Sequence, residues 1–228
     1  VFTIGNQLGE AIRLHTNRKG KEVRDRAIEM LELVGINEPE KRIRQYPFQL
    51  SGGMRQRVMI AMALACEPDI LIADEPTTAL DVTIQAQILE LMQDLQKKLG
   101  MAVILVTHDL GVIADMCDNI IVMYGGRICE RGTAREIFYN PKHEYTKGLL
   151  RSIPNVNNMK KKLVPIAGTP INMLNLPAGC AFCTRCDAAM KICLEEHPEE
   201  MTINENHKAS CWINVRDQLM QKGGEENV

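Results

Sequence analysis

The segment Ile70-Leu71-Ile72-Ala73-Asp74-Glu75-Pro76-Thr77-Thr78-Ala79-Leu80-Asp81 decides how this 228-residue chain folds. It starts as an apolar run and stops abruptly at two acids and a proline, as a buried parallel strand does when it reaches a site at the edge of its sheet. The sequence after it predicts a helix over 82–99, ended by a glycine, and a second buried strand over 102–107, closed by His108. Strands and helices that alternate in this way predict an α/β fold whose parallel strands bring the acids and His108 to one edge.

Helical patterns precede this segment. Apolar residues recur at helical spacing over 3–14 and 21–34, which predicts a small helical unit within residues 1–45. The stretch Leu50-Ser51-Gly52-Gly53-Met54-Arg55-Gln56-Arg57 then leads into another predicted helix, with Ser51 placed to cap it. A helix that begins there presents free backbone N–H groups in its first turn.

The part that follows His108 completes the predicted core. A short helix is expected over 110–116, and two strands over 119–124 and 127–130 are expected to form a hairpin around a Gly-Gly turn. Residues 46–151 are therefore interpreted as the α/β core.

A linker and a cysteine-rich extension are predicted after the core. Proline, asparagine, lysine and glycine dominate residues 152–178, which indicates a linker to a small extension over 179–228. Five of the eight cysteines crowd into that extension, and such clustering without an export signal favours a metal site over disulfides. The other three, Cys66, Cys117 and Cys129, are expected to be small buried hydrophobes.

Composition excludes several classes of function. The net charge of −2 argues against nucleic acid as a partner, because no sequence-wide positive field exists. No run approaches the roughly 18 apolar residues needed to cross a bilayer, so the chain is not expected to span a membrane. The N-terminus has neither an initiator methionine nor the pattern of a secretory signal, and is interpreted as a cut end.

Three features occur in order along the chain: the stretch 50–57, the segment 70–81, and His108 directly after a strand. Together they closely resemble the ATP-binding cassette (ABC) family over about residues 1–151, where they are the signature motif, the Walker B strand with its D-loop, and the switch histidine. Met54 departs mildly from the glutamine most common at that position of the signature motif. The resemblance implies a P-loop-type ABC ATPase core, here with an incomplete parallel sheet, and a helical subdomain.

The resemblance also implies roles for the acids and the histidine. It assigns Asp74 to Mg²⁺, Glu75 to the general base, and His108 to the γ-phosphate and the attacking water. The chemistry agrees, because one carboxylate at a strand end can hold Mg²⁺ through water while the next orients or deprotonates a water. Asp81 resembles the D-loop residue that communicates across a dimer interface, and it is equally suited to be an N-cap.

The signature stretch is suited to bind a phosphate. Ser51, Gly52 and Gly53 precede a helix, so a hydroxyl, backbone N–H groups and the helix dipole can meet an anion with no side chain in the way. Met54 and Gln56 complete the nucleotide-contacting residues expected from the motif. The alternative interpretation is a plain serine cap after a flexible turn.

Two elements of the family are absent from these 228 residues. The sequence contains no Gly-x-x-x-x-Gly-Lys-Ser/Thr and no glutamine loop, so this polypeptide is expected to hold ATP poorly and to be inactive alone. It could still offer its signature motif to the nucleotide of a second ABC ATPase subunit, because family members work as head-to-tail pairs. The alternative is a catalytically silent binding or regulatory module.

The cysteine-rich tail resembles the C-terminal extension of oligopeptide and dipeptide importer ATPases, some of which carry a [4Fe–4S] cluster. His207 is expected to lie near the cluster without ligating it, and Cys183 is an extra thiol. Four thiolates also suit Zn²⁺, and the spacing of the cysteines does not distinguish a zinc site from an iron–sulfur cluster. Thiols without any metal are the third alternative. The ligands implied by the resemblance are Cys180, Cys186, Cys193 and Cys211.

The resulting interpretation is an ATPase, using ATP and Mg²⁺, that energises peptide import from the cytoplasmic face of the membrane. The resemblance implies transmembrane permease subunits as partners, a substrate-binding protein indirectly, and no nucleic acid. Nickel or another small solute is the alternative cargo. A soluble ABC ATPase that acts on nucleic acid or ribosomes is a rival, disfavoured by the near-neutral charge and the importer-like tail.

Overall fold

The computed structural model of the protein describes residues 2–153 and 164–225. The chain divides into two compact units, Val1–His108 and Asp109–Val228. Residues 154–163 of the predicted linker lie outside the described part.

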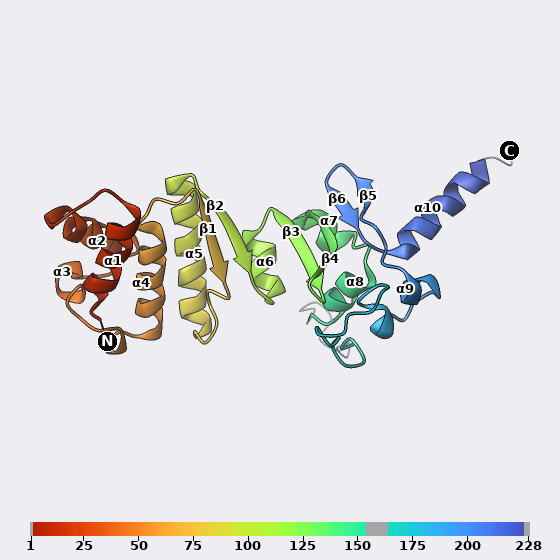
Figure 1. Cartoon of the computed structure of the whole chain (residues 1–228), viewed down its shortest axis with the longest axis horizontal. Coiled ribbons are helices and arrows are strands. Elements are labelled where there is room, and N and C mark those ends of the chain that lie inside the picture. The colour runs from red at the N-terminus through yellow and green to blue at the C-terminus, as the bar shows by residue number, and fades with distance from the viewer. Residues whose placement is uncertain (1, 154–163, 226–228) are drawn as a thin grey trace. The chain divides into compact units, whose positions relative to one another are not determined.

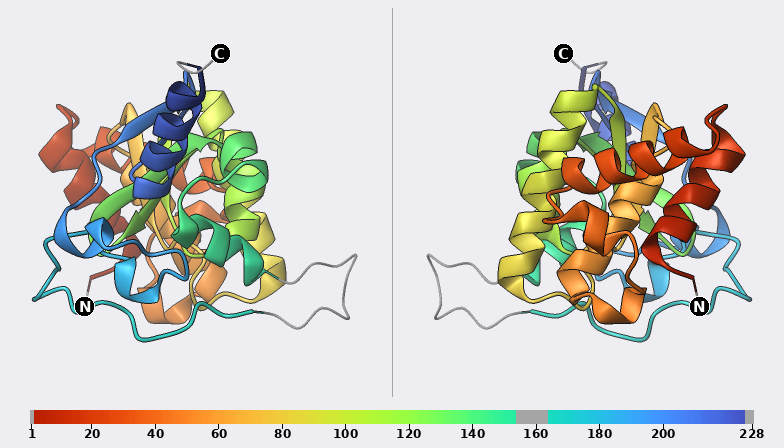
Figure 2. Two further views of the ribbon diagram at one scale, coloured as in Figure 1. Left: turned by 90° about the vertical axis from the view of Figure 1, so that its right-hand side faces the viewer. Right: turned by 90° about the vertical axis from the view of Figure 1, so that its left-hand side faces the viewer.

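The first unit opens with a group of helices, α1 (Ile4–His15), α2 (Lys21–Leu33) and α4 (Gly52–Leu64), which pack on one another. The short α3 (Pro39–Arg42) and η1 (Pro47–Gln49) connect α2 to α4 (Figure 1). The right-hand view of Figure 2 looks onto this group. Apolar side chains three or four positions apart form its core: Ile4, Leu8, Ile12, Val23, Ala27, Met30, Leu31, Val58, Ala61 and Leu64. The helical unit predicted at the start of the chain is therefore present.

A pair of parallel strands follows. β1 (Ile70–Asp74) and β2 (Ala102–Val106) pair in a register that sets Asp74 opposite Val106. The helix between them, α5 (Val82–Leu99), makes this a strand–helix–strand unit of the α/β type, as the sequence predicts.

The ends of α5 lie where the sequence predicts them. The Asp81 carboxylate accepts a hydrogen bond from the Ile84 N–H over 3.0 Å, which caps the first turn. Gly100 adopts a left-handed φ of 66° and its N–H donates to the Gln96 carbonyl, which ends the helix. Ile88, Met92 and Leu95 form the buried face.

The prediction that both strands are buried is wrong for one face of the pair. Leu71 is buried, whereas Ile72 is 66% exposed and Ile104 is 50% exposed. Successive side chains of a strand point to opposite faces, and the described residues cover only the face that carries Leu71.

The second unit begins with α6 (Leu110–Met116) and the predicted hairpin, whose strands are β3 (Asn119–Tyr124) and β4 (Arg127–Thr133). β4 extends three residues beyond the predicted strand end. The remaining elements are α7 (Ala134–Tyr139), α8 (Glu144–Arg151), η3 (Cys183–Arg185), α9 (Ile192–Glu195), β5 (Met201–Asn204), β6 (His207–Ala209) and α10 (Trp212–Glu225).

The cysteine-rich extension shares a sheet with the hairpin. The strand order is β3-β4-β6-β5, and β6 runs antiparallel to β4 with His207 opposite Gly132 (Figure 1). A glycine suits this position, because a β-carbon on Gly132 would lie 2.9 Å from the Asn206 carbonyl oxygen. No pattern in the sequence predicts the pairing, since it joins segments about 75 residues apart.

No helix in the described residues is long and apolar enough to cross a bilayer.

Candidate functional site

Glu75 lies just beyond β1 in an unusual backbone conformation. Its φ of 47° is in the left-handed region, which residues other than glycine rarely adopt. Its N–H donates to the Val106 carbonyl over 2.9 Å, so the residue after β1 is tied to the last residue of β2. The Glu75 side chain is thereby held at the carboxyl ends of both strands, which is the edge that the sequence predicts for the site.

The Glu75 carboxylate has two side-chain partners. Oε1 lies 2.6 Å from His108 Nδ1, and Oε2 accepts a hydrogen bond from Thr78 Oγ1 over 2.8 Å. The hydrogen bond from His108, and after it the one from Thr78, holds the pKa of Glu75 below its ordinary value. The structure therefore brings Glu75 and His108 together with an ionised carboxylate between two donors. Thr78 was not predicted to belong to this site, although it lies three residues after Glu75.

Asp74 and Asp81 flank this pair along the chain. Asp74 ends β1 with its side chain exposed, so its oxygens are accessible to a cation. Asp81 is exposed and caps α5, which confirms the N-cap interpretation; its role at a subunit boundary stays a prediction.

Ser51 caps α4, since its Oγ accepts a hydrogen bond from the Met54 N–H over 3.3 Å. The prediction that Ser51 caps this helix is therefore correct. Gln56, two residues after Met54, is half-buried. The first-turn N–H groups of a helix have no intrahelical partners, so the 13-residue α4 keeps the features of an anion site.

The two glycines after Ser51 have unequal packing roles. A β-carbon on Gly53 would lie 2.6 Å from Ile84 Cγ2, whereas one on Gly52 would lie 3.4 Å from Leu80 Cδ2. Gly53 thus allows the start of α4 to approach the start of α5 closely, and this brings the signature stretch beside the segment around Asp81.

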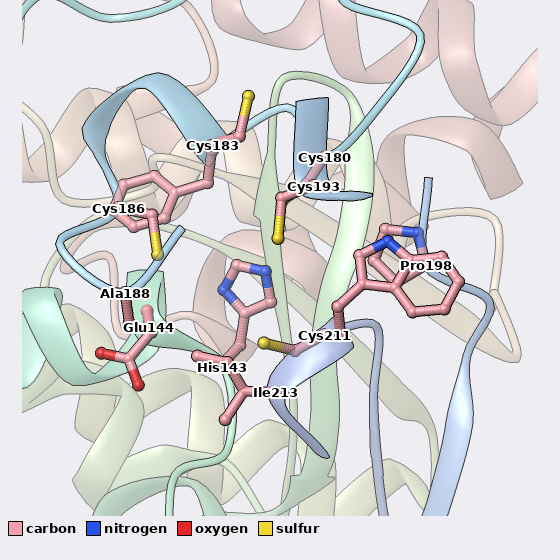
Figure 3. Close-up of a pocket in the computed structure, with 12 residues that line it drawn as sticks. His143, Glu144, Cys180, Cys183, Cys186, Ala188, Cys193, Pro198, Cys211 and Ile213 are labelled. Atoms are coloured by element: carbon pink, nitrogen blue, oxygen red, sulfur yellow. The ribbon is translucent and has the colours of Figure 1, made fainter. Parts of the chain in front are cut away.

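Five cysteines of the extension line one pocket in the second unit. Figure 3 shows the Cys186 and Cys211 sulfurs directed into it around the His143 ring, whereas the Cys183 sulfur points away from them. The backbone closes one side, because the Cys180 N–H donates to the Cys193 carbonyl over 2.8 Å. The cysteines are Cys180, Cys183, Cys186, Cys193 and Cys211, and the wall also includes His143, Glu144, Phe182 and Trp212.

Burial keeps most of these thiols protonated. It raises the pKa of Cys180 to about 11 and that of Cys186 to about 11, and the neighbouring thiols add to both shifts. The pKa values of Cys183 and Cys211 are raised for the same first reason. All five are free of disulfides. Removal of these protons therefore needs a compensating positive charge, such as a metal.

The donor set fits a thiolate-bound metal by its chemistry, since several free thiols share one largely apolar pocket. In the described part of the chain, however, no three His, Cys, Asp or Glu side chains are placed to hold a metal ion. A [4Fe–4S] cube takes its ligands on separate irons, so it requires a wider spacing of sulfurs than one zinc ion with bonds of about 2.3 Å.

His207 differs from its expected place, and Cys129 has a neighbour that the sequence does not predict. His207 does not lie against the cysteines but is bonded through Nε2 to Glu130, and both side chains are fully buried. Cys129 is a buried hydrophobe as predicted, and it also lies close to the cysteine pocket. Burial, followed by the charges of Cys180 and other neighbours, raises the pKa of Cys129 to about 12.

Comparison with known families matches two parts of the chain. Residues 3–78 match the family described as ABC transporter, and residues 129–193 match the family described as Oligopeptide/dipeptide transporter, C-terminal region.

Two curated relatives come from Bacillus subtilis (strain 168). The chain is 53% identical over 212 residues to the Dipeptide transport ATP-binding protein DppD, a match that covers 93% of this chain and 63% of DppD. It is 52% identical over 211 residues to the Oligopeptide transport ATP-binding protein OppD, covering 92% of this chain and 59% of OppD. The chain therefore spans about three-fifths of the length of these relatives.

Solved structures agree on the fold. A dimeric post-hydrolysis state of the ATP-binding cassette MJ0796 bound to ADP and Pi is 34% identical with a TM-score of 0.52, over 59% of this chain and 58% of that one. An ABC transporter in an inward-facing conformation is 23% identical with a TM-score of 0.57, over 65% of this chain and 57% of that one, and shows the fold alone. The chain therefore has the mixed α/β fold of ABC ATPase structures, and over 92–93% of its length its sequence is similar to dipeptide and oligopeptide transport ATP-binding proteins.

Proposed function

We propose that this chain is part of an ATPase that energises the import of dipeptides and oligopeptides through an ABC transporter. The observation that carries the proposal is the Glu75–His108 contact at the ends of two parallel strands. The names of the relatives, dipeptide and oligopeptide transport ATP-binding proteins, support the class of cargo. Nickel or another small solute is the alternative cargo.

Glu75 acts as the general base in this proposal. Its ionised carboxylate accepts a proton from the attacking water, and His108 orients the carboxylate and reaches the terminal phosphate. Asp74, exposed at the end of β1, holds Mg²⁺. The ion, when bound, neutralises charge on the phosphates.

The signature stretch serves a second ATPase subunit. Ser51, Gly52 and Gly53, with Met54 and Gln56, contact the nucleotide held by that subunit in a head-to-tail pair, and Asp81 lies at the boundary. The N-terminus of α4 supports this, and so does a related ATP-binding cassette described as a dimer bound to ADP and Pi. The transporter's permease subunits and, indirectly, a substrate-binding protein complete the assembly, which holds the chain at the cytoplasmic face of the membrane.

A catalytically silent binding or regulatory module is the alternative function, and one experiment separates it from the ATPase. The test joins the chain to the phosphate-binding lobe of a related ATPase and compares Glu75→Gln with Glu90→Gln, an exposed position on α5. We expect Glu75→Gln to bind ATP without turnover and Glu90→Gln to behave as the parent fusion. Hydrolysis by Glu75→Gln at the parent rate would remove Glu75 from the mechanism. Hydrolysis by the 228-residue chain alone would show that it needs no added lobe.

We also propose that the extension holds a [4Fe–4S] cluster through Cys180, Cys186, Cys193 and Cys211. Support comes from their shared pocket, and from the Cys183 sulfur, which points away from it in Figure 3. Iron and acid-labile sulfide in anaerobically purified protein test the proposal, and stoichiometric zinc without iron would overturn it in favour of a structural zinc site.

A further inference from the structure

His143 joins the cysteine pocket to the backbone of the second unit. It is the N-cap of α8 and is only 2% exposed. The ring Nδ1 of His143 accepts a hydrogen bond from the Tyr145 backbone N–H over 3.0 Å, and the backbone N–H of His143 donates to the Glu130 carboxylate over 3.0 Å. The imidazole packs near Phe182 and lines the pocket, where Figure 3 shows it among the cysteine sulfurs.

The cap fixes the tautomer of the ring. A nitrogen that accepts a hydrogen bond presents its lone pair, so Nδ1 of His143 carries no proton. The proton of the neutral ring is therefore on Nε2. In this tautomer Nε2 cannot ligate a metal, because its lone pair is part of the ring π-system, but it can donate a hydrogen bond.

The pocket offers few other donors. The Trp212 indole N–H is already donated to the Glu196 carbonyl over 2.9 Å. Glu144 is an acceptor that pairs with Lys147. Apart from the thiols themselves, His143 Nε2–H is the side-chain donor left over in the described wall of the pocket.

We propose that His143 donates its Nε2–H to a metal-bound cysteine sulfur of this pocket and so tunes the centre without ligating it. The inference rests on the thiolate-bound cluster proposed above. A hydrogen bond to sulfur stabilises the more negative, reduced form of a cluster, so this residue raises its reduction potential. The same side chain thus has two functions: Nδ1 caps α8 and Nε2 faces the metal centre.

Two substitutions separate these functions. His143→Asn keeps a carbonyl oxygen that can cap α8, but its amide is too short to reach the sulfurs. His143→Gln places an N–H₂ group close to the position of Nε2 and is the rescue variant. The full chain is loaded anaerobically with iron and sulfide, and iron content, absorption spectrum and midpoint potential are measured for each protein.

We expect equal iron and sulfide content in all three proteins. The midpoint of His143→Asn should fall by the equivalent of roughly tenfold in the reduction equilibrium, about 59 mV for a one-electron couple, with His143→Gln closer to wild type. Wild-type protein that takes up no iron and sulfide would overturn the cluster, and this role with it. A loaded wild type and an unchanged midpoint in His143→Asn would overturn the role of His143 alone. Loss of iron from folded His143→Asn would mean that His143 is a ligand, which also contradicts the proposal.

Discussion

The imidazole of His207 and the carboxylate of Glu130 meet at 2.7 Å, and neither side chain has any exposed surface. Glu130 lies on β4 and His207 on β6, so the bond joins the hairpin to the strand that arrives from the extension. The same carboxylate accepts hydrogen bonds from the backbone N–H groups of Lys142 and His143. One buried acid therefore orders the β4–β6 pairing and the chain that leads into α8.

Replacing Glu130 by alanine should strongly destabilise the protein. The change removes the acceptor of the buried His207 Nε2, of the buried His143 backbone N–H and of the half-buried Lys142 backbone N–H. This loss costs on the order of 3 kcal/mol in the free energy of unfolding. Urea unfolding of the chain measures the loss. The control is Glu200→Ala, which removes a part-exposed ion pair with Arg131 and should cost at most about 1 kcal/mol. Equal losses for both variants would contradict the role of Glu130.

A β-carbon at Gly53 should also destabilise the fold. It would lie 2.6 Å from Ile84 Cγ2, and overpacking of this kind typically costs about 1–3 kcal/mol. Gly52→Ala is the matched control, since its β-carbon would be 3.4 Å from Leu80 and alanine is the better helix former. We expect Gly53→Ala to lower the urea midpoint, Gly52→Ala to leave it nearly unchanged, and Gly53→Ala combined with Ile84→Ala to show less than additive losses. Additive losses would show that α4 and α5 do not meet at this glycine.

The pKa of Glu75 should depend on His108 more than on Thr78. Its folded-state pKa is lowered from 4.5, so the stabilisation is present above that value and is lost as the pH falls through the lowered pKa. His108→Ala should move the pKa up toward its ordinary value, and Thr78→Val should move it less, because the bond to His108 is the larger cause. Carboxyl ¹³C shifts of Glu75 followed by NMR against pH measure both changes. An unchanged titration in His108→Ala would mean that the 2.6 Å contact does not persist in solution.

Features that depend on neighbouring residues could be predicted from the sequence. The caps at Ser51 and Asp81, the glycine end of α5 and the hairpin each rest on a few consecutive residues, and the structure has them all. The contact between Glu75 and His108 could also be predicted, because the carboxyl ends of neighbouring parallel strands lie at the same edge of a sheet.

Features that depend on distant residues could not be predicted. Nothing near His207 indicates that it contacts Glu130, since a contact between two buried polar side chains far apart in sequence leaves no local pattern. The approach of Cys129 to the cysteine pocket depends on the β4–β6 pairing in the same way. The exposed face with Ile72 and Ile104 also could not be foreseen, because apolar composition predicts burial but not what covers a strand.

Cys183 and Cys193 should differ in their effect on the metal. The Cys183 sulfur points away from the Cys186 and Cys211 sulfurs, whereas Cys193 belongs to the proposed ligand set and its backbone holds Cys180 through a 2.8 Å hydrogen bond. Cys183→Ser should therefore keep the iron, sulfide and brown colour of anaerobically prepared protein, with broad absorption near about 400 nm typical of thiolate-bound clusters. Cys193→Ser should lose most of the iron. It should loosen the extension while the helices of the first unit keep their stability, because those helices have their own core. Amide hydrogen exchange resolved along the chain measures this difference. If Cys183→Ser lost the colour and Cys180→Ser kept it, the ligand set would have to include Cys183, and the orientation of its sulfur would change when the metal binds.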